Sequence, residues 1–413
     1  MERRNVLKNR VFLHPRYTAK KLEELMLHLL KNIFSVILLM SMLMLFPNCK
    51  NTGTIVPEQG PRVNLTEERV LYENSEYNNC CQKAICSETA EEIYIVFTRV
   101  PPTLDSTSIM FAVLDSGGNV ITSPIHIGTV MSLSSFPNII QSNGKIFVSW
   151  HGSADALKGF TIVEIQRNGT IQSRVEIAEA PPVADKGNAF LADPTTLHYF
   201  YNAELDEDIS SIIYVRVSID NGFTDTYSQV VGNGSSLVHH AYWSNGSIRV
   251  VYTQQGDLMI GTFDQQSDTF NGTVLLETLD HFDPIVSFWP LSVDEVVVAY
   301  GQISTALDLQ FYSPAGTNTR SVAVSSEAYN FSNIAVHNSL VGIAWVTGEN
   351  KVACTLWDLE SAQLYETSLV SSNASGIAIE PFLLNTPNGI VVFWRDCRNH
   401  NGGDIYYRRI TGE

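Results

Sequence analysis

The chain has 413 residues, of which 44% are hydrophobic and 10% aromatic, and its formal net charge is −17. This composition is typical of a folded chain and not of a disordered one. The acidic balance repels phosphate backbones and anionic lipid, so we expect no nucleic-acid partner and no polybasic membrane contact. The length exceeds one ordinary globular core, which favours several domains or a repeat architecture whose units pack against their neighbours.

The N-terminal region has the pattern of an export signal. Residues 33–46 (IFSVILLMSMLMLF) are apolar apart from two serines, and Lys31 precedes them. This stretch is shorter than the roughly 20 residues of a spanning helix and suits the h-region of a signal peptide. Cys49 follows directly, which resembles the lipobox of bacterial lipoproteins, although Pro47 and Asn48 stand where small residues are usual. The resemblance implies a secreted chain that is lipid-anchored through Cys49.

Two other interpretations of this region remain: an uncleaved signal anchor over residues 26–46, and an ordinary cleaved signal with an incidental cysteine. Residues 1–25 form a charged leader unlike a signal peptide, whereas a start at Met26 gives a signal of normal length. We expect a leader and signal peptide over 1–48, the lipidated Cys49 with a polar tether over 49–60, and a folded domain over 61–413. The lipid would hold this domain to a bacterial membrane, at the outer membrane, the surface or the periplasmic side.

The remainder of the chain is dominated by a repeat. Runs of β-favouring residues that end in an aromatic recur at intervals of 45 to 53 residues, and no helical period appears after residue 50. A second strand and a tight turn follow each run, as at residues 167–169 (RNG), where Asn and Gly suit hairpins. The aromatics that end the runs are Phe97, Trp150, Tyr201, Tyr252, Tyr300, Trp345 and Trp394.

Each repeat therefore predicts a blade of about four short antiparallel strands, and the fold class is all-β, a seven-bladed β-propeller. Six or eight blades and a tandem of β-sandwiches are the alternatives. The last repeat stops just after Ile410 and lacks an outermost strand, whereas residues 61–72 precede the first repeat without a unit of their own. We expect this N-terminal strand to pair into the last blade and close the ring, which removes an exposed sheet edge.

Two motifs give the domain a family resemblance. Residues 394–399 (WRDCRN) and 404–408 (DIYYR) resemble the W-x-D-x-R-N…D-I-Y blade repeat of bacterial secreted propellers related to the sialidase-like group. Residues 218–224 (SIDNGFT) are similar to the Asp-box turn of sialidases and related propellers. That resemblance implies that Asp220 braces a hairpin and is structural, not catalytic.

A catalytic interpretation is less well supported. Residues 98–101 (TRVP) are similar to the R-I-P motif of sialidases, and Asp105 lies six residues past Arg99. However, Arg99 follows the aromatic strand, whereas the family's motif precedes it, and the other arginines and the Tyr–Glu pair of that family are not identified. No catalytic residue is assigned, with Asp105 kept as a candidate only. We favour a binding module for protein or glycan over an enzyme, and the alternative is a sialidase-like glycoside hydrolase.

The loops that follow the aligned aromatics should emerge on one face, because the blades repeat by rotation. The longest and most charged of them follow Phe97, Tyr201 and Trp394. A ligand site is expected there, although each charge could instead brace a loop or face solvent. We expect the protein to be a monomer. The candidate ligand-binding residues are Arg99, Asp105, His151, Arg395, Asp396, Arg398 and Asp404.

No metal site and no cofactor are expected. Residues 206–208 (DED) could bind Ca²⁺, but three acids on one loop usually face solvent. His239 and His240 are adjacent on a predicted strand, where neighbouring side chains point to opposite faces.

Five cysteines follow Cys49, an odd number that leaves at least one unpaired in a monomer. The first three, at 80, 81 and 86, form a C-C-x₄-C cluster without a second pair, which is poor evidence for zinc. An oxidising compartment permits a bridge from Cys86 to Cys80 or Cys81. The remaining two are Cys354 in a predicted strand and Cys397 in a predicted loop.

Overall fold

The computed structural model describes residues 61–73, 77–103, 106–130, 136–152, 159–177, 183–206, 209–219, 223, 226–232, 236–278, 285–292, 295–301, 305–372, 377–398 and 403–412. Residues Gly60–Glu413 form one compact unit, and its described part consists of strands and turns without helices. Accordingly, these residues include no helix with the length and hydropathy needed to cross a membrane. The predicted leader, Cys49 and the tether lie outside the described residues.

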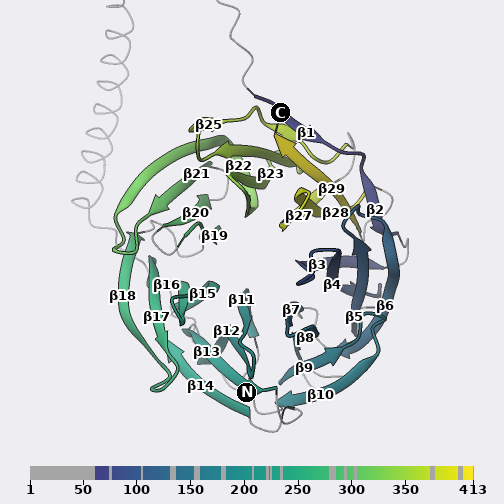
Figure 1. Cartoon of the computed structure of the whole chain (residues 1–413), viewed down its shortest axis with the longest axis vertical. Coiled ribbons are helices and arrows are strands. Elements are labelled where there is room, and N and C mark those ends of the chain that lie inside the picture. The colour runs from purple at the N-terminus through teal and green to yellow at the C-terminus, as the bar shows by residue number, and fades with distance from the viewer. Residues whose placement is uncertain are drawn as a thin grey trace, which may run out of the picture. The chain divides into compact units, whose positions relative to one another are not determined.

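Four-stranded antiparallel sheets stand around a central axis in the order of the sequence (Figure 1). The first blade contains β3 (Asn78–Cys86), β4 (Glu92–Val100), β5 (Thr107–Asp115) and β6 (Val120–Val130). The second contains β7 (Asn138–Ser142), β8 (Lys145–His151), β9 (Phe160–Ile165) and β10 (Ile171–Ile177). The third contains β11 (Val183–Ala192), β12 (Thr196–Asp206), β13 (Ile209–Ser218) and β14 (Thr226–Gly232). The fourth contains β15 (Ser236–Ser244), β16 (Ser247–Gln254), β17 (Asp257–Asp264) and β18 (Thr269–Thr278).

The fifth and sixth blades share one long strand. The fifth contains β19 (Ile285–Pro290), β20 (Val296–Gly301), β21 (Thr305–Tyr312) and the first part of β22 (Asn318–His337). Because β22 then continues as the innermost strand of the sixth blade, the two blades form a continuous eight-stranded sheet. The sixth blade continues with β23 (Leu340–Thr347), β24 (Val352–Asp358), β25 (Gln363–Leu364) and β26 (Ser368–Leu369).

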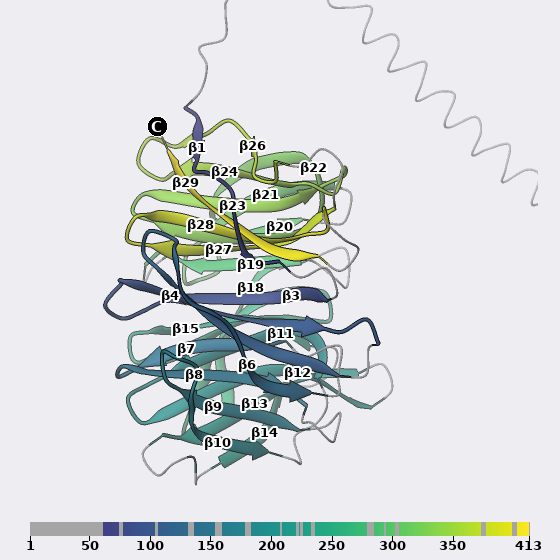
Figure 2. The ribbon, with the colours of Figure 1, turned by 90° about the vertical axis from the view of Figure 1, so that its right-hand side faces the viewer.

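The seventh blade combines the two ends of the domain. Its strands β27 (Ala378–Thr386), β28 (Gly389–Asp396) and β29 (Asp404–Gly412) are completed by β1 (Val63–Leu65) and β2 (Arg69–Tyr72). Both N-terminal strands pair antiparallel with β29, with Asn64 opposite Thr411 and Val70 opposite Tyr406. Figure 1 and the side view in Figure 2 both show β1 beside β29. The predicted seven-bladed propeller and its closure by the N-terminal segment are confirmed.

The predicted aromatic runs form the second strand of each blade and lie between neighbouring sheets. Trp150 of β8 is 0% exposed and packs in one cluster with Phe111 of the preceding blade. The preceding blade needs a glycine at position 128, because a Cβ there would lie only 2.7 Å from the Trp150 ring. Similarly, Phe393 of the last blade shares a cluster with Phe97 of the first, so the apolar packing continues across the closure.

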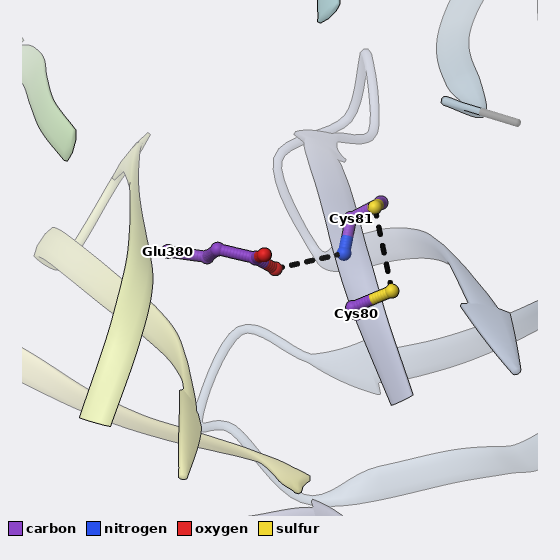
Figure 3. Close-up of side chains that lie close together, drawn as sticks. All are labelled: Cys80, Cys81 and Glu380. Carbon is purple, nitrogen blue, oxygen red and sulfur yellow. Dashed lines mark hydrogen bonds between the residues drawn. The ribbon is translucent and has the colours of Figure 1, made fainter. Parts of the chain in front are cut away.

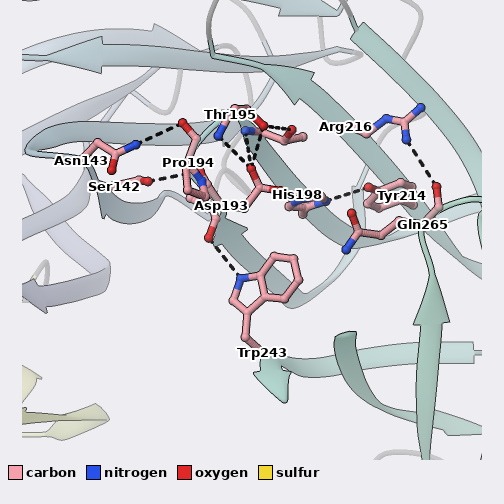
Figure 4. Close-up of polar contacts among 12 residues, drawn as sticks. Ser142, Asn143, Asp193, Pro194, Thr195, His198, Tyr214, Arg216, Trp243 and Gln265 are labelled. Carbon is pink, nitrogen blue, oxygen red and sulfur yellow. Dashed lines mark hydrogen bonds and ion pairs between the residues drawn. The ribbon is translucent and has the colours of Figure 1, made fainter. Parts of the chain in front are cut away.

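Polar contacts join neighbouring blades on the side of the ring opposite the loops that follow the aromatic strands. The turn between β11 and β12 receives hydrogen bonds from both neighbouring blades: Ser142 Oγ donates to the Asp193 carbonyl at 3.2 Å, and Trp243 Nε1 donates to the Ala192 carbonyl at 3.1 Å (Figure 4). His198 lies between Asp193 Oδ2 (3.1 Å) and the Tyr214 hydroxyl (2.8 Å) and is fully buried. This Asp–His–Tyr chain therefore braces the third blade through a buried histidine and a partly exposed Asp193.

The cysteine bridge that the sequence permitted is not formed. All five described cysteines are free thiols, and Cys86 Sγ donates to the Asn385 carbonyl at 3.1 Å. Cys86 lies at the opposite end of β3 from Cys80 and Cys81. A strand rises about 3.3 Å per residue, which separates Cys86 from Cys81 by roughly 15 Å. Because a disulfide needs Cα atoms within about 7 Å, this fold does not allow the bridge that the sequence permitted.

Candidate functional site: the loop face

The described loop face is formed by the ends of the aromatic strands. Strand order repeats from blade to blade, so the loops after β4, β8, β12, β16, β20, β23 and β28 emerge on one side of the ring. Several of these strands run past their aromatic residue, so that Arg99, His151, Arg395 and Asp396 belong to strands and not to loops as predicted. Asp105 lies outside the described residues.

The last blade holds a buried ion-pair network. Asp396 is 1% exposed and accepts hydrogen bonds from Arg398 Nη2 at 2.6 Å, from the Arg398 backbone at 2.9 Å and from Trp394 Nε1 at 3.3 Å. Arg398 Nη1 also pairs with Glu68, which lies between β1 and β2. The guanidinium lies 4.2 Å from the centre of the Tyr406 ring. Arg398 therefore ties the loop after β28 to the segment that closes the ring.

The network shifts the ionisation of Glu68 and Arg398 toward their charged forms. Burial alone would raise the pKa of Glu68, but hydrogen bonds from Arg398 and Ser372 hold it below its ordinary value. Burial likewise opposes the charge on Arg398, yet its pKa is raised because Asp396 and Glu68 both pair with it. These charges stabilise one another inside the fold. Asp396 and Arg398 pair with each other, as the bracing alternative requires, and ligand binding by these residues stays a prediction.

Arg395 and Asp404 are the other two candidate ligand-binding residues of the last blade. Arg395 Nη1 lies 3.6 Å from Glu380 Oε1, and both side chains are largely buried. Asp404 is 0% exposed and stands opposite Asp396 in the pairing of β28 with β29. The structure thus brings four of the predicted residues together, and it adds Glu68 and Glu380, which the sequence did not identify.

Arg99 lies at the end of β4 on the first blade. Its guanidinium is 3.7 Å from the centre of the Tyr77 ring and 5.7 Å from that of Tyr72. Such cation–π contacts are favourable and fix a long side chain in place. Arg99 therefore packs against the segment between β2 and β3, and no ion pair of Arg99 with a described carboxylate is found.

His151 is a core residue between the second and third blades. It is 2% exposed, and its Nε2 lies 3.0 Å from the Tyr199 hydroxyl. The rings of Tyr201 and Phe160 lie 4.5 Å and 5.2 Å from the imidazole, measured between centroids. Burial lowers the pKa of His151 to about 3. The imidazole is therefore neutral at physiological pH, and its contacts are with aromatic residues and not with the other candidate residues that the structure describes.

We expect acid to destabilise the fold through His151. Because its pKa is near 6.5 when unfolded and about 3 when folded, the unfolded chain binds the proton between these values. The free energy of unfolding then falls by about 1.4 kcal/mol per pH unit below pH 6.5, or roughly 2–3 kcal/mol at pH 4.5. His239 and His240 act in the same direction, since burial lowers the pKa of each to about 4.

The measurement compares urea denaturation at pH 7 and pH 4.5 for the wild-type chain and for His151→Gln. In the variant, the free energy of unfolding should differ less between pH 7 and pH 4.5, by about 2–3 kcal/mol, because glutamine does not titrate. An unchanged pH dependence in the variant would show that His151 does not contribute in this way.

Cys80 and Cys81 form a polar cluster with Glu380 where the innermost strands of the first and last blades meet (Figure 3). The two Sγ atoms are 3.4 Å apart, and the Cys81 backbone N–H donates to Glu380 Oε2 at 3.2 Å. A hydrogen bond from Cys81 lowers the pKa of Cys80, and the same contact raises that of Cys81. Lys83 lies further along β3, over the Phe382 ring, and burial lowers its pKa.

Other predicted features are not tested. Asp220 of the Asp-box motif lies outside the described residues, and so do Glu207 and Asp208 and the side chain of Asp206, where Ca²⁺ was considered. The predicted contact with a protein or glycan ligand and the monomeric state stay predictions. No sequence pattern indicated Glu68 or Glu380, because each lies about 300 residues from its partner, Arg398 or Cys81 respectively.

Comparison of the sequence with protein-family models gives no match, and comparison with curated proteins gives none either. Among solved structures, Raptor from Chaetomium thermophilum aligns over 86% of this chain and 30% of its own, with TM-score 0.53 and 10% identity. The NanB sialidase of Streptococcus pneumoniae aligns over 84% and 71%, with TM-score 0.47 and 8% identity. A puromycin hydrolase aligns over 79% of this chain, with TM-score 0.46 and 13% identity, and the chain spans about half of its length, 51%. At these identities the likeness concerns the fold alone.

Proposed function

We propose that this chain is an exported lipoprotein, held to a bacterial membrane by lipid on Cys49, whose propeller binds a protein or a glycan. The apolar residues 33–46 and the cysteine that follows them support export and lipid attachment. Residues 50–60 are mainly polar and contain Pro57, which suits a spacer between the lipid and the domain. The outer membrane, the cell surface and the periplasmic side are all compatible locations.

The observation that carries the binding role is the convergence of the strand ends on one face of a closed ring. Loops on a rigid scaffold are where binding residues concentrate. At this face Arg398 is held in place by ion pairs with Asp396 and Glu68. Such bracing fixes loop shape without requiring a reaction.

Hydrolysis is less well supported by the same residues. A glycosidase needs two carboxyl groups that flank a cleft. Asp396 and Asp404 stand opposite each other, but their exposed fractions are 1% and 0%, so neither lies open to a substrate. This burial supports a binding module over a hydrolase.

The proposal is tested with the domain from Thr52 onward and with the full chain. Arrays of glycans and of surface proteins should give saturable binding to the soluble domain, with one ligand class preferred. In the producing cell the full chain should fractionate with the membrane, and Cys49→Ser should release it. Absence of any saturable ligand would contradict the binding role, and a Cys49→Ser chain that stays in the membrane would contradict the lipid anchor.

A further inference from the structure

The cluster of Cys80, Cys81 and Glu380 has the composition of a metal site. Its donors come from β3 and β27, about 300 residues apart in the sequence, and the two sulfur atoms and a carboxylate oxygen all lie within 4.8 Å of one another (Figure 3). We propose that these three residues bind a thiophilic divalent ion, and that Zn²⁺ is the ion they fit. This proposal does not depend on which ligand the loop face would bind.

The backbone of β3 departs from regular geometry in a way that brings both thiols together. Adjacent residues of a regular strand point to opposite faces of the sheet. Here the pairing of β3 with β4 shifts register between Cys80 and Lys83, and Cys81 has a φ of 58°. As a result the two sulfur atoms are 3.4 Å apart.

The opposing strand has a matching irregularity. The pairing of β27 with β28 shifts register between Ile379 and Phe382, and Glu380 has a φ of 56°. Left-handed conformations of residues other than glycine cost of the order of 1–3 kcal/mol and cluster at functional sites. Two such residues therefore face each other where the first and last blades meet, and each contributes a metal-binding group.

The donor chemistry selects the ion. Thiolates prefer soft or borderline ions such as Zn²⁺ over Ca²⁺ and Mg²⁺, which take oxygen ligands. With Zn–S bonds of about 2.3 Å, tetrahedral coordination places two sulfur atoms about 3.8 Å apart, so the 3.4 Å separation needs only a small adjustment. Three protein donors leave a fourth position for water or a ligand, as in zinc sites that are not purely structural.

Neighbouring groups support the donors. Arg395 Nη1 lies 3.6 Å from Glu380 Oε1, while the other carboxylate oxygen faces Cys81. The Thr98 hydroxyl lies 3.1 Å from Cys80 Sγ. Outer contacts of this kind orient metal ligands. Two thiolates and a carboxylate would carry three negative charges, one more than the two positive charges of Zn²⁺ balance. The Arg395 guanidinium offsets the excess charge.

The test measures Zn²⁺ binding to the full chain, purified without a polyhistidine tag and kept reduced. Titration against a chromogenic chelator should give one equivalent for the wild type. Cys80→Ser and Cys81→Ser should each weaken binding on the order of 100-fold, and Glu380→Gln roughly 10-fold or more. Cys86→Ser is the matched control, because Cys86 lies on the same strand outside the cluster, and it should bind as the wild type does.

A second measurement keeps the test independent of stability. Co²⁺ in place of Zn²⁺ should give thiolate charge-transfer absorption in the wild type and in Cys86→Ser, with circular dichroism confirming that each variant is folded. The absorption should be lost in Cys80→Ser and Cys81→Ser. The proposal is overturned if the reduced wild type binds no zinc, or if these two variants bind it as tightly as Cys86→Ser does.

Discussion

Deleting residues 62–72 should lower the melting temperature by roughly 10 °C or more, because the ring then opens at the seventh blade. The deletion removes both strands that pair with β29 and the buried side chains of Val63 and Leu71. Each of these side chains contributes about 1.5–3 kcal/mol through burial. It also removes Glu68, the ion-pair partner of Arg398, and exposes the edge of β29 to other chains.

Two point variants show whether the loss of stability comes from buried side chains or from any substitution in the segment. Leu71 is 5% exposed and Val70, its neighbour on β2, is 38% exposed. Leu71→Ala should cost about 2–3 kcal/mol and Val70→Ala well under 1 kcal/mol. Differential scanning calorimetry of the wild type, the deletion variant and the two point variants measures these differences. A deletion variant that melts as the wild type does would refute closure by the N-terminal segment.

Replacing Arg398 with alanine should destabilise the domain by about 3 kcal/mol, the second large effect we expect. The reason is the Asp396 carboxylate, which is 1% exposed and would lose the guanidinium that pairs with it. Glu68 would lose the same partner. Adding Asp396→Asn to Arg398→Ala should recover part of the loss, because the uncompensated buried charge is then removed.

The matched control is Arg62→Ala. Arg62 pairs with Glu366 at 3.3 Å, but the two side chains are 53% and 47% exposed. Exposed pairs of this kind contribute about 0–1 kcal/mol. Chemical denaturation of the four chains gives the comparison. If Arg398→Ala costs no more than Arg62→Ala, then the network in the last blade does not brace the loop face.

The fold was predictable because one physical pattern repeats. Each blade needs a strand that is buried on both faces, and this requirement places residues such as Trp150 and Trp394 at near-constant spacing. The unpaired end of the last repeat and the spare segment at 61–72 then predicted closure. The sequence did not predict that β22 (Asn318–His337) serves two blades, because nothing in its residues marks the point where one blade ends.

The site was less predictable, for two physical reasons. Strands continue beyond their aromatic residues, and His151 therefore lies in the core instead of a loop. Contacts between the first and last blades also join residues that are distant in the chain, as in Cys81 with Glu380. Register shifts in β3 and β27 create that contact, and sequence patterns do not reveal such bulges.

Measuring turnover shows whether the loop face binds a ligand without transforming it. The soluble domain and its Asp105→Asn variant are incubated with a panel of fluorogenic glycosides and with any glycan that the arrays identify, and product is followed by fluorescence and mass spectrometry. We expect saturable binding with no product above the level of buffer alone, for both proteins. Turnover by the wild type that Asp105→Asn abolishes would contradict this expectation and would identify a hydrolase.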